Sequence, residues 1–532
     1  MEETVEQARD TEVWYSLERQ KPLPESLIWD LQRRYYAGRG ANAWRQSEVP
    51  YYVTNNPLLA NSYAEIVFAF LREQRRLAPD DRQGDEPLYI CELGAGSGRF
   101  AFHFLRRLTR LCEQARLPPL SFRYVLTDFT QKNLDVWRVH PCFQPFFESG
   151  VLEVALFDID RTDQLALQLS GQTLGTADLQ RPLVVIANYV FDSVPQELFY
   201  VNEQCCHQCL VSLIINEDPG KLTAADLLER LQYNCDYRAL TEAFYRESYL
   251  QTILAEYQHT LTDTHLLFPA ASLRCLQRLK ALSTRGALLL SADKGEHRLE
   301  ALQGEALPVL VGHAACFSFT VNYHAFSLFC EQGGGLALSP TSQHNCLNVI
   351  CLLMVDEPAE YLETQRAYQH HVQEFSPDDF FTINRLSSFY IAEMSAQDIL
   401  AYVRLSGYDG YLFAHYWPRL LELIPALERG ERQALVGAIA QIWEQYFHLG
   451  EEPDLACLLA CLLYEMEDYA GALAYFERSV EIYGEHTGTL FNMAACCQLT
   501  GQSARAASLL RKVLQYAPDN QQARALLAEA EA

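Results

Sequence analysis

The stretch ELGAGSGRF, Glu92 to Phe100, decides the fold of this chain of 532 residues. An apolar, strand-like run at residues 88–91 precedes it, and a helix-like run at residues 101–105 follows it. The glycines at positions 94, 96 and 98 are therefore expected in a loop between a strand and a helix. Because glycine has no side chain, such a loop lets a ligand lie directly against the backbone. The question is which ligand the loop accepts.

Apolar segments alternate with amphipathic helical patterns around this loop. Continuous apolar runs such as residues 182–187 are typical of strands buried on both faces, which favours a parallel sheet covered by helices. The last two strand candidates are joined by six residues, too few for a helical crossover, so the final strand should run antiparallel. We predict an α/β doubly wound sheet of seven strands. The strand candidates are residues 88–93, 122–127, 151–157, 183–187, 287–292, 335–339 and 346–355.

The patterns also predict how the chain is divided into domains. The region between about 200 and 285 is too long for one crossover and contains helical segments, so we interpret it as an inserted cap beside the site. After residue 358 the strand signal ends and helical patterns take over. The predicted parts are an N-terminal helical region at 1–84, the sheet domain at 85–358 with a helical insertion at about 200–285, a helical linker region at 359–430, and helical repeats at 431–532.

Self-similarity at a fixed spacing indicates the repeats. The stretch that begins at Glu467 aligns with the stretch that begins at Gly501, 34 residues later, and this is the tetratricopeptide period. Small residues recur at Ala472 and Ala506, where paired helices must approach closely, and a degenerate earlier repeat would begin at Gln433. The alternative is an ordinary helical bundle. We predict an all-α, tetratricopeptide-like C-terminal domain that binds a protein or peptide.

Composition excludes several classes of protein. The 68 acidic and 42 basic residues give a formal net charge of -26, which repels phosphate backbones, so we expect no nucleic-acid partner. No apolar run approaches the roughly 18 residues of a membrane span, and the acidic residues 1–6 do not resemble a signal peptide. The 16 cysteines are too sparse for a disulfide scaffold, so we expect reduced thiols in the cytoplasm. The oligomeric state is left open.

One cysteine-rich segment raises the question of a metal. CCHQC, residues 205–209, contains a C-x-x-C pair, but a structural zinc site normally needs a second pair of ligands. Cys235 and His259 are the nearest later candidates, and their spacing matches no zinc motif. We interpret the segment as strand and turn and expect no metal.

The spacing of the glycines narrows the choice of ligand for the loop. A phosphate-binding P-loop would end in Gly-Lys-Ser or Gly-Lys-Thr, and the chain has Gly98-Arg99-Phe100. A dinucleotide fingerprint would have its third glycine where Arg99 stands, which argues against an NAD-dependent oxidoreductase. Leu-Gly-x-Gly-x-Gly after an acidic residue resembles motif I of class I S-adenosylmethionine-dependent methyltransferases.

This resemblance implies a role for each polar residue at the ends of the successive strands. Glu92 would face the cationic end of the cofactor, and Asp128 would accept the ribose hydroxyls. Asp158, preferred over Asp160, would meet the adenine amino group. Asp192 is the first candidate to orient the methyl acceptor and take its proton, and His324 is the second. Each acid alone could instead be a solvated loop residue. The predicted cofactor-binding residues are Glu92, Gly94, Ala95, Gly96, Gly98, Asp128, Asp158 and Asn188, and the predicted catalytic residues are Asp192 and Asn188.

Four stretches resemble, in order, the signatures of the MidA-like methyltransferases. This family includes the mitochondrial complex I assembly factor that methylates arginine on a protein subunit. The resemblance implies S-adenosyl-L-methionine as cofactor, and it covers roughly residues 50–355. Two interpretations follow: a methyltransferase whose protein substrate is recruited by the C-terminal repeats, or a catalytically idle, cofactor-binding scaffold that acts through them. The stretches are ELGAGSGRF at 92–100, ANYVFDSVPQELF at 187–199, LLLSADKG at 288–295 and FTVNYHAFSLFCEQGG at 319–334.

Overall fold

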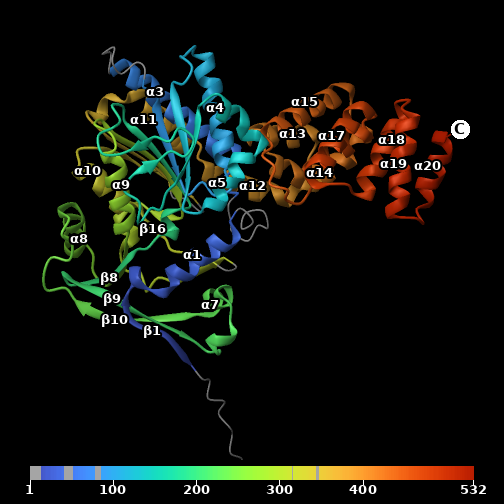
Figure 1. Ribbon diagram of the computed structural model, residues 1–532. Coiled ribbons are helices and arrows are strands. Elements are labelled where there is room, and N and C mark those ends of the chain that lie inside the picture. Colours follow the sequence, from blue (N-terminus) through green and yellow to red (C-terminus); the bar gives the residue numbers. More distant parts are fainter. Residues whose placement is uncertain (1–13, 41–51, 78–85, 314–315, 343–346, 532) are drawn as a thin grey trace, which may run out of the picture. The chain divides into compact units, whose positions relative to one another are not determined.

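The fold is taken from a computed structural model of the chain (Figure 1). The chain divides into two compact units, one formed by residues 1–54 and 62–379 and the other by residues 55–61 and 380–532. The first unit therefore extends beyond the limit of 358 proposed for the sheet domain, and the second includes a short stretch from the N-terminal part of the chain. The residues that the structure describes are 14–40, 52–77, 86–313, 316–342 and 347–531.

A seven-stranded sheet forms the centre of the first unit. Its strand order is β17-β18-β12-β7-β2-β3-β4. Strands β12, β7, β2, β3 and β4 pair in parallel, whereas β18 runs antiparallel to both β12 and β17. The sheet thus contains all seven predicted strands, and the last one is antiparallel. The strands are β2 Leu88–Leu93, β3 Phe122–Asp128, β4 Leu152–Leu156, β7 Leu183–Asn188, β12 Gly286–Asp293, β17 Leu336–Leu338 and β18 Asn348–Val355.

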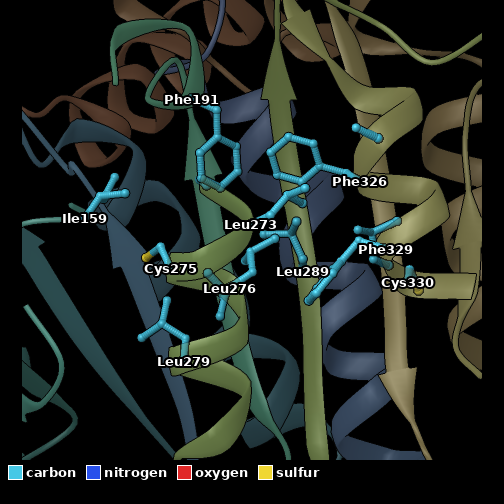
Figure 2. Close-up of a cluster of buried hydrophobic side chains, with 14 of the residues drawn as sticks. Ile159, Phe191, Leu273, Cys275, Leu276, Leu279, Leu289, Phe326, Phe329 and Cys330 are labelled. Atoms are coloured by element: carbon cyan, nitrogen blue, oxygen red, sulfur yellow. The ribbon is translucent and has the colours of Figure 1, made fainter. Parts of the chain in front are cut away.

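Helices cover both faces of this sheet, which explains the continuous apolar strands. Figure 2 shows side chains of α9, such as Leu276, and of α10, such as Phe326, gathered near Leu289 of β12. On the opposite face, Phe104 of α4 contacts Tyr124 of β3. The helices around the sheet are α3 Pro57–Leu77, α4 Arg99–Gln114, α5 Gln131–Val139, α8 Ser248–Thr260, α9 Ala270–Ala281, α10 Tyr323–Gln332 and α11 Leu362–Tyr368.

A second, antiparallel sheet lies where the sequence analysis predicted helices, apart from the strand and turn expected at residues 205–209. Its central strand β9 pairs with β1, β8 and β10, and β8 also pairs with β11 (Figure 1). Strand β1 is polar, and its Tyr15 pairs with Ile215 far along the chain, so local sequence patterns could not reveal it. The inserted region is therefore mixed rather than helical. The strands are β1 Tyr15–Pro22, β8 Glu197–Asn202, β9 Cys205–Ile215, β10 Gln232–Ala239 and β11 Thr264–Phe268, and the helix α7 spans Ala224–Arg230.

Helix α1, Leu27–Arg39, packs on this second sheet. Ile28 and Trp29 belong to the same buried cluster as Leu198 of β8 and Val211 of β9. Arg33, on the same helix, places its guanidinium at the carboxyl edge of the central sheet. Helix α1 therefore joins the inserted sheet to the candidate site described below.

The second unit consists of helices, and its core includes residues from both of its chain segments. Leu58, in the first turn of α3, packs against a cluster built mainly from residues after 380. Ala472 of α17 and Ala506 of α19, the predicted small positions, are fully buried. Within the described ranges, no helix has the length and apolar character needed to cross a membrane. The helices after α11 are α12 Pro377–Ser387, α13 Ala396–Leu405, α14 Gly410–Leu423, α15 Arg429–Gln445, α16 Leu455–Glu465, α17 Tyr469–Tyr483, α18 Thr487–Leu499, α19 Ser503–Tyr516 and α20 Gln521–Glu531.

Candidate functional site

The glycine loop joins β2 to α4 in a conformation that requires glycine. Gly94, Gly96 and Gly98 have φ angles of +59°, +54° and +80°, in the left-handed region that L side chains rarely adopt. Space is also limited, because a Cβ at Gly94 would lie 2.8 Å from Cγ2 of Val190 and one at Gly98 would lie 3.0 Å from Nε1 of Trp137. Conformation therefore accounts for all three glycines, and packing gives a second reason at Gly94 and Gly98.

Asp128, at the end of β3, is directly bonded to this loop. The N–H of Gly96 donates to its buried carboxylate. Oδ1 also accepts the N–H of Thr130 at 2.8 Å and its hydroxyl at 2.9 Å, and Oδ2 accepts Nδ2 of Asn133 at 2.8 Å. Burial raises the pKa of Asp128, and these hydrogen bonds oppose the shift. With the Gly96 N–H included, four donors approach the roughly four acceptor sites of this carboxylate, so a ligand hydroxyl would share or replace one of them.

Glu92, at the end of β2, is a buried carboxyl beside the loop. The hydroxyl of Tyr124 donates to Oε2 of Glu92 at 2.8 Å. Burial raises the pKa of Glu92 to about 8, although the Tyr124 hydrogen bond lowers it. Among the described residues, no basic side chain pairs with this carboxyl. Burial disfavours the ionised form of Glu92, so a cationic group bound beside it would stabilise the carboxylate.

Asp158, the predicted adenine contact, forms an ion pair with Arg33 of α1. Nη1 of Arg33 lies 2.5 Å from Oδ2 of Asp158, and Nη2 lies 3.4 Å from Oδ1. Oδ1 also accepts the N–H of Asp160 at 3.1 Å. A ligand amino group would thus compete for this carboxylate with the bidentate guanidinium of Arg33.

Asn188 lies at the carboxyl end of β7, next to the loop. Its Oδ1 accepts the hydroxyl of Tyr63 at 3.0 Å and the N–H of Ala292 at 3.1 Å. Its Nδ2 is buried and has no hydrogen-bond partner among the residues described. The next residue, Tyr189, has a φ of +48°, which is unusual for a large side chain and turns the chain sharply after the strand. Asn188 therefore presents a buried donor that a ligand acceptor could satisfy.

Asp192 forms an acidic pair with Asp293, which ends β12. The N–H of Asp192 donates to Oδ2 of Asp293 at 3.3 Å, and the hydroxyl of Ser193 donates to Oδ1 of Asp192 at 2.7 Å. Burial raises the pKa of Asp192 to about 6. Burial and the neighbouring Asp192 raise the pKa of Asp293 well above its usual range. The two carboxyls therefore do not both ionise readily, as expected for like charges that share a buried site.

The fold thus brings most of the predicted residues to one edge of the central sheet. The loop, Asp128, Asn188 and Asp192 follow strands whose carboxyl ends lie side by side in the order β12-β7-β2-β3. Sequence reasoning did not select Asp293, Tyr63 or Arg33. For Asp293 a signal existed, since it ends the fifth predicted strand at the same edge. The other two come from helices outside the alternating pattern.

Comparison with known proteins gives a family match for the C-terminal part only. A family model described as tetratricopeptide repeat matches residues 463–530, which contain both aligned stretches of the predicted repeat, 467–484 and 501–518. The degenerate copy expected from Gln433 lies outside the matched residues. A search of curated proteins finds no match.

Among solved structures, an uncharacterised protein from Burkholderia thailandensis is similar to the chain, with 13% sequence identity, a TM-score of 0.36, and coverage of 64% of this chain and 97% of that one. A member of the same superfamily from the same organism, bound to S-adenosyl-homocysteine, matches with 12% identity, a TM-score of 0.36 and coverage of 64% and 97%. An O-methyltransferase family protein from that organism has 8% identity, a TM-score of 0.28 and coverage of 63% and 64%. Because these similarities are low, we argue function from the chain's own site.

Proposed function

We propose that the chain is an S-adenosylmethionine-dependent methyltransferase that acts on a protein recruited by its C-terminal repeats. The observation that carries the proposal is the position of Asp128 against a loop of left-handed glycines at the carboxyl edge of the sheet. The loop is held to β3, the strand of Asp128, by the hydrogen bond from the Ala95 N–H to the Thr127 carbonyl oxygen at 2.9 Å. Ligands of open α/β sheets bind at this edge. The proposal includes the MidA-like resemblance of the four stretches quoted above.

The residues at this edge fit the proposed cofactor in two respects. Nδ2 of Asn188 is a buried donor without a partner among the described residues, and Glu92 is a buried carboxyl that lacks a cation there. The cofactor has both an acceptor-rich ribose and carboxylate and a cationic ammonium group. We assign the loop, Glu92, Asp128 and Asn188 to its binding. When bound, S-adenosylmethionine supplies a methyl group that is already activated on a sulfonium sulfur.

The acidic pair suits a role in positioning the methyl acceptor. Asp192 has a pKa near 6, so its carboxylate is mostly ionised at neutral pH and can accept a proton or a hydrogen bond from the acceptor. Ser193 fixes one oxygen of Asp192, and Asp293 receives the Asp192 backbone N–H. We assign Asp192 as the acceptor-facing base and Asp293 as the residue that holds it in place.

The rival function is an idle scaffold that binds the cofactor and displays its helical tail. Two measurements on the full chain distinguish the possibilities: calorimetric binding of S-adenosylhomocysteine, and transfer of a radiolabelled methyl group to proteins of a host lysate. Binding together with labelling of a specific protein supports the methyltransferase. Binding without any transfer supports the scaffold, and the absence of binding contradicts both.

Replacing Asp128 by alanine should weaken cofactor binding by about 2–3 kcal/mol, because a buried ligand hydroxyl would lose its acceptor. Calorimetry with S-adenosylhomocysteine measures the change. Thr130→Val is the matched control, since it removes one internal donor to Asp128 but keeps the carboxylate. We expect its dissociation constant to stay within about twofold of the parent, a difference below 0.5 kcal/mol. Equal losses in the two variants would show that Asp128 only stabilises the turn.

Replacing Ala472 by arginine should destroy recruitment while cofactor binding persists. Ala472 is fully buried between the helices of the repeats, so an unpaired charge there should destabilise the second unit by about 4 kcal/mol or more. Ala474→Arg is the matched control, because Ala474 is exposed on the same helix, α17. Only the first variant should lose methylation of the lysate protein, with unchanged affinity for S-adenosylhomocysteine. Full methylation by Ala472→Arg with melted repeats would show that they recruit nothing.

A further inference from the structure

Three potential metal ligands from three strands converge in the inserted sheet. Cys209 comes from β9, Cys235 from β10 and His265 from β11. Their ligand atoms all lie within 4.8 Å of one another. Both cysteines are free thiols, Cys209 is buried, and the other two residues are half-buried. The three residues form a compact Cys₂His group on one face of the sheet.

The register of the strands explains why these residues meet. Tyr237 of β10 pairs with Cys209, and Cys235, two residues earlier, is on the same face of the sheet. His265 pairs with Tyr200 of β8, and Tyr200 pairs with His207, which shares a face with Cys209. The cluster therefore follows from the pairing of four antiparallel strands rather than from any motif that is continuous in sequence.

The orientation of His265 suits a metal ligand. Its Nδ1 lies 3.3 Å from the carbonyl oxygen of Glu305, which can only accept a hydrogen bond, so Nδ1 carries the proton. The free lone pair is then on Nε2, and Nε2 lies 2.9 Å from the hydroxyl of Tyr237. Histidines that bind metals commonly donate their other ring N–H to a backbone carbonyl in this way.

The kind of ligand identifies the kind of ion. Two thiols and an imidazole favour zinc over magnesium or calcium, which prefer oxygen ligands. Zinc bonds to sulfur at about 2.3 Å and to nitrogen at about 2.0 Å, so the ligands of a tetrahedral site are separated by roughly 3.3–3.8 Å. The observed limit of 4.8 Å requires only small side-chain movements to reach those separations.

We propose that Cys209, Cys235 and His265 bind one zinc ion, with the Tyr237 hydroxyl or water in the fourth position. Binding displaces the protons of the two thiols to solvent and breaks the hydrogen bond between the Tyr237 hydroxyl and Nε2 of His265. It forms two zinc–sulfur bonds, one zinc–nitrogen bond and one zinc–oxygen bond. The ion connects β10, whose residues are mostly exposed, to β9 and β11. The site departs from the expectation that this segment holds no metal, and it contains neither His259 nor the remainder of CCHQC. The proposal is independent of the methyltransferase assignment.

Cobalt(II) reports directly on such a site, because thiolate ligands give a charge-transfer band and tetrahedral geometry gives strong visible bands. The reduced, metal-free full chain is titrated with cobalt(II), and zinc is then added. We expect both sets of bands to saturate at one equivalent and zinc to abolish them. Amide hydrogen exchange in β10 should also slow when zinc is present. No thiolate band in the wild-type chain would overturn the proposal without recourse to any variant.

Variants locate the ion. Cys235→Ala and His265→Ala alter half-buried positions and should remove or strongly weaken the bands while circular dichroism stays unchanged. Cys205→Ala is the matched control, because Cys205 is exposed on the same strand as Cys209 and outside the cluster. It should bind cobalt as the wild type does. Bands that persist in Cys235→Ala, or that vanish in Cys205→Ala, would overturn the assignment.

Discussion

Replacing Asp192 by asparagine is expected to lower kcat for methyl transfer by about 100-fold or more, because a positioned general base contributes this much. Asparagine keeps the size of the side chain and an oxygen that can accept the Ser193 hydrogen bond, but it cannot take a proton. Cofactor affinity should change by less than about twofold, or below 0.5 kcal/mol. Initial rates with radiolabelled S-adenosylmethionine, together with calorimetry, separate the two effects.

The pH profile gives an independent check on Asp192. Its folded-state pKa is raised to about 6, and a base acts when deprotonated, so activity should fall as pH drops through about 6. In Asp192→Asn the rate should be low at every pH, and the fall in activity near pH 6 should be absent. Asp135→Asn alters an exposed carboxyl on α5 and should leave rate and profile unchanged. A full rate in Asp192→Asn would show that no proton passes to this carboxyl.

Replacing Gly96 by valine is expected to abolish binding of S-adenosylhomocysteine, with a loss of about 100-fold or more, equivalent to about 2.8 kcal/mol. Gly96 has a φ of +54°, which a β-branched residue strongly disfavours, and its N–H donates to Asp128. Valine would therefore shift the backbone that touches the proposed ribose contact and fill the adjoining space. Isothermal calorimetry on the folded variant measures the loss.

Backbone strain alone must be separated from this effect. Gly171 has a φ of +71° in the turn between the short strands β5 (Leu165–Ala166) and β6 (Thr173–Leu174), with open space around a Cβ. Gly171→Val thus introduces similar strain away from the loop and should keep cofactor affinity. If both variants bind normally, the loop is not the cofactor site. If both lose binding, the strain acts through global stability.

Much of the central sheet could be predicted from the sequence, because its strands are buried on both faces and each has a continuous apolar run. The glycine loop could be predicted equally well, since Gly94, Gly96 and Gly98 all have the left-handed conformation that only glycine adopts readily. The inserted sheet could not be predicted from the sequence, because β1 and β10 are polar edge strands whose partners are distant in sequence. Their stability comes from pairing, which local patterns do not record.

Side-chain partners within the candidate site were the least predictable part. Asp158, predicted as the adenine contact, is instead paired with Arg33 of α1, a helix more than a hundred residues earlier in the chain. The Cys₂His group illustrates the same limit, because Cys209, Cys235 and His265 have no motif spacing. Both arrangements depend on strand register and helix docking, which arise only once distant elements have packed.

The division of α3 between the two units has a consequence for the order in which the chain folds during synthesis. Every strand of the central sheet leaves the ribosome before Phe380, so the first unit can complete its core early. Residues 55–61 are made long before their packing partners and must wait for the last third of the chain. Any exchange of the helical unit between related proteins would therefore have to carry this early segment with it, because cutting the gene at one point would leave the transferred helices incomplete.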